Sequence, residues 1–215
     1  MNIQNQTVLH IDLDRKLRNI KMNNNLSETS ARLSFHGRAF IAVSHNAETE
    51  VELLWSSAFG AMYRAYYASQ VAHWNIESRE FSSDHAYFRA QYEFWQETID
   101  NVAEHIRTYD VELPEKLSTF VDSIELEVRT DDLGYFHTYL QRLLQVLRIL
   151  IKINSKAEEI NDVGSIDLVG GLVRDIRKNY WMAASHMPKP DKVKAMNELN
   201  APDVKLAGVV VDEKQ

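Results

Sequence analysis

Long stretches of this 215-residue chain repeat apolar residues every three or four positions and contain almost no helix breakers. The chain has only 7 glycines and 4 prolines, and three of the prolines lie near the C-terminus. A spacing of three and four places apolar side chains on one face of an α-helix, whereas a half-buried strand requires strict alternation. The pattern therefore predicts an all-α fold built from long amphipathic helices.

The spacing predicts four long helices, at residues 47–75, 83–109, 131–159 and 165–185. Ser82, Ser83 and Asp84 offer side-chain caps for the start of the second helix. A short link makes the first two helices an antiparallel hairpin, and the segment from Pro114 to Leu126 indicates a short helix in the connection that follows. The expected architecture is a ferritin-like four-helix bundle with a short helix in its long crossover connection.

The bundle is expected to occupy residues 46–187, between an N-terminal extension (1–45) and a C-terminal tail (188–215), because Pro188 stops the fourth helix. A disordered or loosely docked extension is the simplest interpretation of the polar first segment. A DNA-contacting arm is the alternative, because basic side chains can bind phosphates by releasing counterions. The basic residues of this arm, which oppose only Glu28 within their span, are Arg15, Lys16, Arg18, Lys21, Arg32 and Arg38.

Composition limits the other classes of function. A net charge of −7 argues against nucleic-acid binding through the whole surface. The absence of cysteine excludes disulfides and thiolate metal sites. The most apolar stretch, 143–153, is far too short for a membrane span, and no secretory signal is evident at the N-terminus. We therefore expect a cytoplasmic protein without membrane contact, associated with the nucleoid if the basic arm binds DNA.

Two histidines and two carboxylates of the first two helices form a mixed nitrogen and oxygen ligand set. His73 and His85 are followed by Asp100 and Glu104, and iron or a similar divalent transition metal prefers such ligands. On one helix, Asp100 lies about 22 Å from His85, whereas ligand atoms approach a metal to about 2.0–2.2 Å. If the four residues act together, an antiparallel second copy must supply the two acids, and the two-fold contact then creates two equivalent sites.

The same residues resemble a known signature. His73-Trp74-Asn75, followed by His85, Phe88, Asp100 and Glu104, is similar to the pattern of the Dps family, the mini-ferritins that protect DNA during starvation. The resemblance covers roughly residues 47–187 and includes the run 178–182 in the fourth helix. The chain contains no Glu-x-x-His, the pair that usually builds a di-iron site within one chain. That absence favours a site between subunits.

The resemblance implies a homo-oligomer, a hollow dodecamer built from two-fold dimers, that protects DNA from oxidative damage. In it Fe(II) is oxidised by hydrogen peroxide or oxygen at a mono- or di-iron centre, and the ferric product is stored inside. The ligands of such a ferroxidase are carried over as His73 and His85 from one subunit and Asp100 and Glu104 from its partner. Trp74 matches the tryptophan that the family places beside this centre.

Arg89 departs from the family pattern, which usually has an aspartate one turn after the second histidine. A guanidinium cannot bind a cation and adds positive charge beside His85. We expect it to weaken iron binding unless it pairs with Glu93, with Asp84 or with a carboxylate across the interface. Two functions therefore remain open: a Dps-like ferroxidase, and a non-catalytic shell or scaffold protein whose iron site is degenerate.

The remaining titratable residues have simpler interpretations. His105 and His137 are expected to be hydrogen-bonded core residues, the usual role of a single histidine on an apolar helix face. Four acids could line an ion-entry pore, as the resemblance implies, but solvated helix ends explain them equally well. These acids are Glu158, Glu159, Asp162 and Asp167.

Overall fold

The computed structural model describes residues 47–116 and 132–204, which form helices without any strand. The prediction of an all-α fold is confirmed for these residues. None of the helices in these two ranges is long and apolar enough to cross a membrane. The helices are α2 (Ala47–Asn75), α3 (Phe81–Thr108), α4 (Asp132–Ile160), α5 (Val163–Ser185), α6 (Lys189–Leu199) and the short 3-10 helix η2 (Pro202–Val204).

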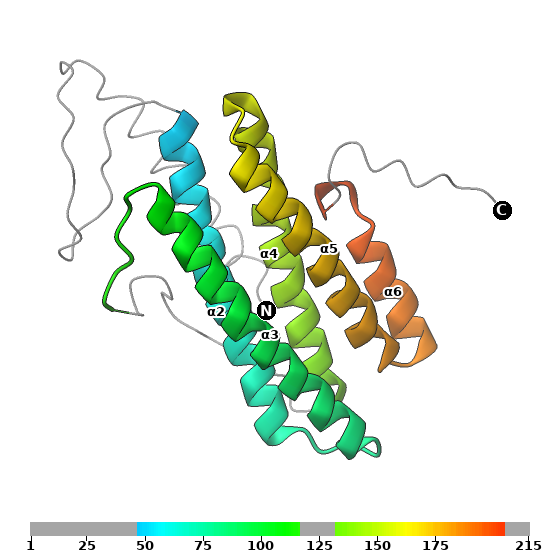
Figure 1. Cartoon of the computed structure of the whole chain (residues 1–215). Helices are drawn as coiled ribbons and strands as arrows, with labels where there is room; N and C mark the ends of the chain where they lie inside the picture. Colours follow the sequence, from blue (N-terminus) through cyan, green and yellow to red (C-terminus); the bar gives the residue numbers. More distant parts are fainter. Residues whose placement is uncertain (1–46, 117–131, 205–215) are drawn as a thin grey trace, which may run out of the picture. The chain divides into compact units, whose positions relative to one another are not determined.

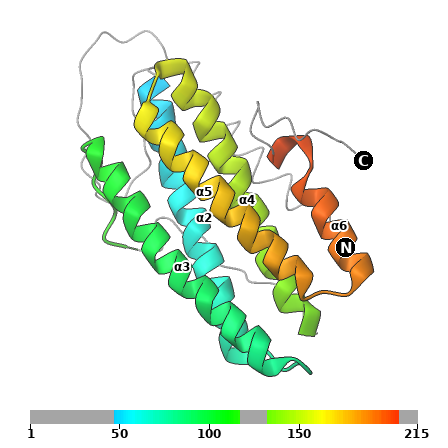
Figure 2. The ribbon, with the colours of Figure 1, turned by 45° about the vertical axis from the view of Figure 1, so that its right-hand side comes forward.

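The four long helices lie side by side along a common direction, with α6 beside α5 (Figures 1 and 2). The helix α2 packs against both α3 and α4, and α4 packs against α5. Since α3 ends at one end of the bundle and α4 begins at the other, the connection between them must span its length (Figure 1). This is the predicted long crossover. Its expected short helix falls almost entirely on residues 117–131, and the basic arm on residues 1–45; both lie outside the described residues.

The core combines apolar stripes with large aromatic side chains that satisfy their own polar atoms. Trp95 and Tyr139 are completely buried. The indole Nε1 of Trp95 donates to the hydroxyl of Tyr139 (2.9 Å), which donates to Oε1 of the buried Gln91 (2.9 Å). A buried polar group without a partner costs about 1–3 kcal/mol. This chain of hydrogen bonds lets aromatic rings fill the centre of the bundle without that penalty.

The start of α3 differs from the prediction. The helix begins at Phe81, and its N-cap residue Glu80 makes no side-chain capping bond. Asp84 is instead 5% exposed and accepts a hydrogen bond from the hydroxyl of Ser78 (2.6 Å). Its other oxygen lies 2.7 Å from Nδ1 of His186, which caps the C-terminus of α5. The predicted cap was wrong because Asp84 joins the start of α3 to the end of α5.

The C-terminal segment continues as a helix after Pro188. This proline is the N-cap residue of α6 and a second proline follows in the first turn, where the missing N–H costs nothing. The guanidinium of Arg177 donates to the main-chain oxygens of Leu199 and Val204, at 3.0 Å each. The hydroxyl of Tyr180 also donates to a carbonyl of α6 (3.0 Å). These bonds from α5 reach carbonyls of α6 and of η2, including that of the last residue of α6, and hold this segment against the bundle.

Candidate metal centre

The α2–α3 hairpin brings His73 and His85 together as a stacked pair, with ring centroids 3.8 Å apart and 26° between the planes. Nδ1 of His73 lies 2.9 Å from the main-chain oxygen of His85, and Nδ1 of His85 lies 2.8 Å from that of His73. A carbonyl oxygen only accepts, so each Nδ1 carries the hydrogen and donates it. With the hydrogen on Nδ1, the neutral form of each ring has an unprotonated Nε2, whose lone pair can bind a metal.

Two further rings contact this pair. Phe81 stacks on His85 with centroids 5.1 Å apart, and Tyr92 lies edge-on to His73 at 5.3 Å. Both histidines are half-buried, whereas the side chain of Trp74, next to His73, is 60% exposed. Ring contacts and main-chain bonds thus fix the orientation of the imidazoles before any ligand binds. No local pattern in the sequence predicts this role for Phe81 or Tyr92, because it depends on the contacts between the two helices.

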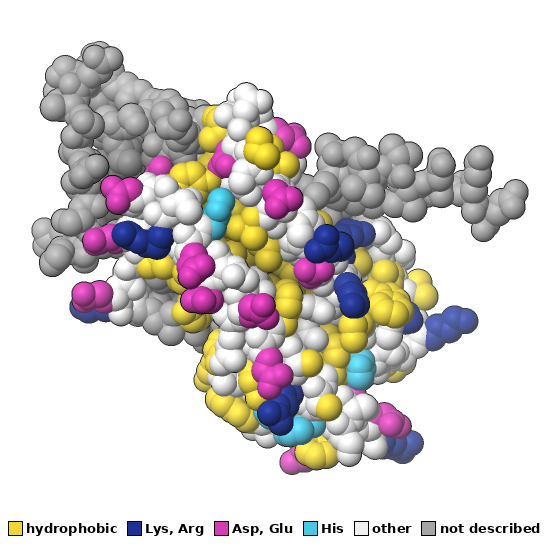
Figure 3. Space-filling model, viewed as in Figure 1, with side chains coloured by type: hydrophobic (Ala, Val, Ile, Leu, Met, Phe, Trp, Pro, Cys, Tyr) yellow, Lys and Arg dark blue, Asp and Glu magenta, His cyan; other side chains and the backbone are white. Residues whose placement is uncertain are grey.

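Asp100 and Glu104 lie on the exposed face of α3, well above the histidine pair along the helix axis. Figure 3 shows acidic side chains spread along this face of the molecule. Within residues 47–116 and 132–204, no three histidine, aspartate or glutamate side chains come together closely enough to hold a metal ion. One protomer therefore assembles the imidazole half of the predicted ligand set and holds the carboxylate half elsewhere on the same helix.

Arg89 forms an ion pair with Glu93, one of the partners expected for it. Nε of Arg89 lies 2.9 Å from Oε1 of Glu93, and the two side chains are 65% and 52% exposed. The hydrogen bond and the charge of Glu93 raise the pKa of Arg89 above its ordinary value, so the guanidinium remains positive. Asp84, the other candidate on α3, is occupied by Ser78 and His186. The pair uses Nε only, and no described residue accepts a hydrogen bond from the two Nη groups of Arg89.

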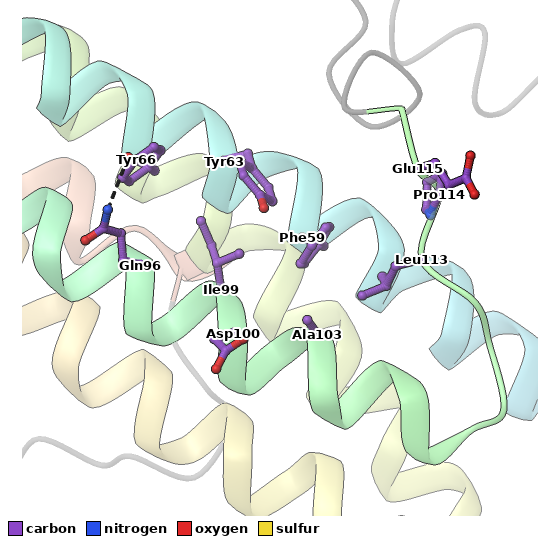
Figure 4. Close-up of a pocket in the computed structure, with 10 residues that line it drawn as sticks. All are labelled: Phe59, Tyr63, Tyr66, Gln96, Ile99, Asp100, Ala103, Leu113, Pro114 and Glu115. Carbon is purple, nitrogen blue, oxygen red and sulfur yellow. Dashed lines mark hydrogen bonds between the residues drawn. The ribbon is translucent and has the colours of Figure 1, made fainter.

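A groove of about 590 Å³ runs along the α2–α3 seam next to Asp100. Figure 4 shows rings and apolar side chains from both helices facing this groove, with Asp100 at its edge and directed away from α2. The surface beside one predicted ligand is thus mainly apolar, which suits contact with another protein surface. The lining residues are Phe59, Tyr63, Tyr66, Gln96, Ile99, Asp100, Ala103, Leu113, Pro114 and Glu115.

A third histidine, His105, belongs to a polar cluster at the other end of α3. The hub of this cluster is the completely buried hydroxyl of Ser165, which accepts from Nε1 of Trp55 (2.8 Å). The same oxygen lies 3.0 Å from Nε2 of His105 and 2.6 Å from the hydroxyl of Tyr109. Tyr109 donates to a carboxylate oxygen of Asp162. His105 is hydrogen-bonded as expected, but it is half-buried and not a core residue. The cluster ties α2, α3 and α5 together.

Burial and these hydrogen bonds change the titration of the cluster. Burial lowers the pKa of His105. Burial, together with the hydrogen bond to Asp162, raises the pKa of Tyr109 to about 12. Burial alone would raise the pKa of Asp162, but bonds from the main-chain N–H of Ser165 and from Tyr109 outweigh it, so the net shift is downward. Asp162 also caps α5, since its Oδ1 accepts from that N–H at 3.0 Å. Its carboxylate is thus engaged within the bundle.

Comparison with known proteins places the chain in a family. A model of the ferritin-like domain matches residues 57–193. The chain belongs to the ferritin-like family. Its described residues include the four long helices of a ferritin-like bundle, and the predicted fold class is confirmed.

Solved Dps proteins share the fold at low sequence identity. Dps of Vibrio cholerae O1, described as a member of the ferritin-like diiron-carboxylate superfamily, is 21% identical with a TM-score of 0.60, covering 72% of this chain and 100% of that one. Dps of Thermosynechococcus elongatus is 18% identical with a TM-score of 0.61, and the match covers 66% of this chain and 93% of that one. Dps of Staphylococcus aureus is 20% identical with a TM-score of 0.60, and the match covers 66% of this chain and 97% of that one. The resemblance to Dps proteins is confirmed in the fold.

Two curated relatives match part of the chain. An uncharacterised low temperature-induced protein of Nostoc sp. (strain PCC 7120) is 25% identical over 118 residues, which is 53% of this chain. Its homologue in Anabaena variabilis matches to the same extent. The match spans 66% of the length of each relative, just under two thirds.

Proposed function

We propose that this protein is a Dps-like mini-ferritin that binds Fe(II) at sites shared between two copies of the chain and oxidises it. The observation that carries the proposal is the stacked pair of His73 and His85, whose reciprocal Nδ1 bonds leave both Nε2 atoms available. The ferritin-like family and the Dps-like fold support an iron-binding role. Imidazole and carboxylate ligands are the set that non-haem iron uses.

A shared site follows from the separation of the two ligand pairs within one protomer. Asp100 and Glu104 of a partner copy would complete the shell around His73 and His85. Because a two-fold contact repeats each interaction, every dimer would contain two such sites. The apolar groove next to Asp100 provides contact surface on the same side of the seam. We propose that these dimers assemble into a hollow dodecamer, as the Dps resemblance implies, in which ferric iron is stored.

The proposed reaction consumes two harmful reagents together. Two Fe(II) ions each lose one electron, and one hydrogen peroxide takes up these two electrons and two protons to give two waters. The imidazoles and carboxylates hold Fe(II) and stabilise the higher charge of the ferric product. Trp74, exposed beside His73, would lie next to the shared site. Removing Fe(II) and peroxide together suppresses hydroxyl-radical formation, which is how such a protein would protect DNA.

Iron oxidation provides the direct test. Fe(II) is added to the full-length protein with oxygen or hydrogen peroxide, and ferric absorbance is followed over time. We expect protein-dependent acceleration that is lost in His73→Ala. The matched control is His137→Ala, which removes a half-buried histidine of α4. No acceleration by the wild-type protein would refute the ferroxidase proposal.

Mixing two inactive variants tests whether the site is shared. One variant lacks both histidines (His73→Ala with His85→Ala), and the other lacks both acids (Asp100→Ala with Glu104→Ala). In randomly mixed two-fold dimers, half would be heterodimers with one intact site, so about a quarter of all sites should recover. Each variant alone should stay inactive. Failure of mixed, assembled protein to recover any activity would rule out a site shared in this way.

A non-catalytic shell or scaffold protein is the second candidate, and Arg89 favours it because a positive charge replaces a carboxylate one turn from His85. This candidate predicts the same oligomer with no metal affinity. Equilibrium dialysis against Fe(II) under anaerobic conditions separates the two. Binding that His73→Ala abolishes supports the mini-ferritin, whereas an assembled protein that binds no Fe(II) supports the scaffold.

DNA binding is a separate part of the proposal, since it depends on the basic residues of the N-terminal extension. A gel-shift assay should show a complex that is lost when residues 1–45 are deleted. The complex should also weaken steeply with salt, because contacts to phosphates release counterions. Equal binding by the full-length and truncated proteins would exclude this arm as the DNA contact.

A further inference from the structure

The positions of the ligands fix how two α3 helices must face each other, if the proposed shared site exists. His73 and His85 lie at one level along the bundle, because their rings stack at 3.8 Å. Asp100 and Glu104 flank the level of Val102 on α3. In an antiparallel partner, the position of Val102 along α3 must therefore lie opposite the position of His85 on the first copy. This register puts the two-fold axis halfway between them, at Glu93 and Phe94.

The register also places Arg89 opposite the partner's Asp100. Along the helix axis, the level of Arg89 then differs from that of the partner's Asp100 by about two residues, or roughly 3 Å. Arg89 and Asp100 are eleven residues apart, close to three full turns, so both project from the same line along α3. Two antiparallel helices that meet along this line must oppose each arginine to the partner's aspartate.

The conformation of Arg89 fits this role. Glu93 holds the guanidinium through Nε at 2.9 Å, and the side chain is 65% exposed on the same face as Asp100. Its two Nη groups have no acceptor among the residues that the structure describes. A guanidinium offers several N–H groups in one plane, which matches the two oxygens of a carboxylate. The ion pair with Glu93 thus leaves the Nη groups of Arg89 available for an acceptor on a partner copy.

We propose that Arg89 pairs with the partner's Asp100 and takes the place of a second metal ion, so that each shared site holds a single divalent ion. The charges support one ion. Asp100 and Glu104 of the partner balance one divalent cation, and Glu93 balances Arg89, so the site is neutral when one ion is bound and the histidines are uncharged. A second divalent ion would leave two excess positive charges in a closed interface, where charges are poorly screened. Arg89 is therefore a positioning residue that sets the number of ions.

Metal stoichiometry tests this inference without measuring oxidation. Co(II) binding to the assembled full-length protein is measured by equilibrium dialysis and metal analysis. We expect one Co(II) per subunit for the wild type and two for Arg89→Asp, which removes the guanidinium and adds a carboxylate. Arg89→Lys should stay at one, because it keeps the charge. The control Arg174→Asp, which makes the same charge change at another exposed, ion-paired arginine, should also stay at one.

The outcomes separate this inference from the proposed function on which it rests. Two Co(II) per subunit in the wild type, or one in Arg89→Asp, would overturn the role of Arg89 while leaving the shared site intact. Two in Arg89→Lys would overturn the argument from charge. Wild-type binding that His73→Ala does not reduce would instead refute the shared site itself. Size-exclusion chromatography of each variant checks that the oligomer is unchanged.

Discussion

The two ends of α3 carry similar residues in opposite roles. At its start, His85 and His73 stack against each other, with Phe81 and Tyr92 around them. At its end, His105 lies beside aromatic side chains, a serine and a carboxylate. Each histidine of the first pair donates its Nδ1 hydrogen to a main-chain oxygen, which leaves both Nε2 atoms without a local hydrogen bond. At the other end, Nε2 of His105 contacts the hydroxyl of Ser165.

This difference teaches how a ligand site can be told from a structural cluster in one helix. Both ends contain half-buried histidines and aromatic neighbours, so residue type and burial alone do not separate them. The distinguishing property is which ring nitrogen the local hydrogen bonds use: Nδ1 in His73 and His85, and Nε2 in His105. Polar atoms that satisfy one another, as around Ser165, stabilise the fold. An Nε2 lone pair that the local hydrogen bonds leave unused can bind a ligand instead.

The largest expected effect is on metal binding at the first end. His73→Ala should weaken Co(II) binding by about 100-fold or more, since even the loss of an outer-shell partner costs about 10- to 100-fold. The melting temperature should change little, because the ring is half-buried and at the edge of the bundle. Dialysis and a thermal melt measure the two quantities. A large loss of stability with unchanged affinity would reverse the roles assigned to the two ends.

Ser165→Ala should produce the opposite result. It removes the buried acceptor of the Trp55 indole N–H and the hub of the second cluster. Leaving such a donor unsatisfied costs about 1–3 kcal/mol in the free energy of unfolding. Chemical denaturation measures this change, and Co(II) binding should be unaffected. Ser57→Ala is the control, because that exposed hydroxyl bonds only to a carbonyl of its own helix.

Tyr109→Phe should give a smaller loss, of about 1 kcal/mol, by removing one hydroxyl that is partly exposed to solvent. Asp162 would still cap α5 through the main-chain N–H of Ser165. The matched variant is Tyr66→Phe, whose hydroxyl makes contacts on the α2–α3 surface. Equal destabilisation by the two variants would show that the hydroxyl of Tyr109 contributes nothing beyond an ordinary surface bond.

The smallest effect is a pH dependence of stability at the second end. Burial lowers the pKa of His105 in the folded protein below its ordinary value of 6.5. The unfolded chain then binds more protons between the two values, so this contribution is present above the ordinary pKa and is lost as the pH falls below it. The stability of wild type relative to His105→Gln should therefore decrease from about pH 8 to about pH 5. If the difference in stability between wild type and His105→Gln does not change with pH, protonation of this ring is not linked to folding.

The sequence pattern predicted those parts of the fold that depend on local periodicity. The range 47–75 was expected to be helical from its apolar spacing, and α2 has those bounds. The start of α3 was misplaced because Asp84 bonds to Ser78 and His186, and His186 lies far away in the sequence. The helix α6 was missed because Pro188 was taken as a stop, although a proline is equally favourable at a helix start.

The candidate site was predictable only in part. The Dps resemblance implied that His73 and His85 of one chain act together, and the structure shows the two rings in contact. The proposal that Asp100 and Glu104 meet them across an interface remains a prediction. The polar cluster around Ser165 was not foreseen, because its members come from three helices and each looks like an ordinary core or cap residue. The N-cap position of Asp162, directly before a helix, was the one local signal.

The crossed bonds between His73 and His85 have a consequence for how this centre can change over time. Each ring is anchored to a main-chain oxygen, an atom that every amino acid supplies. Replacing one histidine therefore leaves the main-chain acceptor of the other in place, and the remaining imidazole keeps its orientation. A descendant chain could therefore lose one ligand at a time through intermediates that stay folded, without first dismantling the turn that holds the pair.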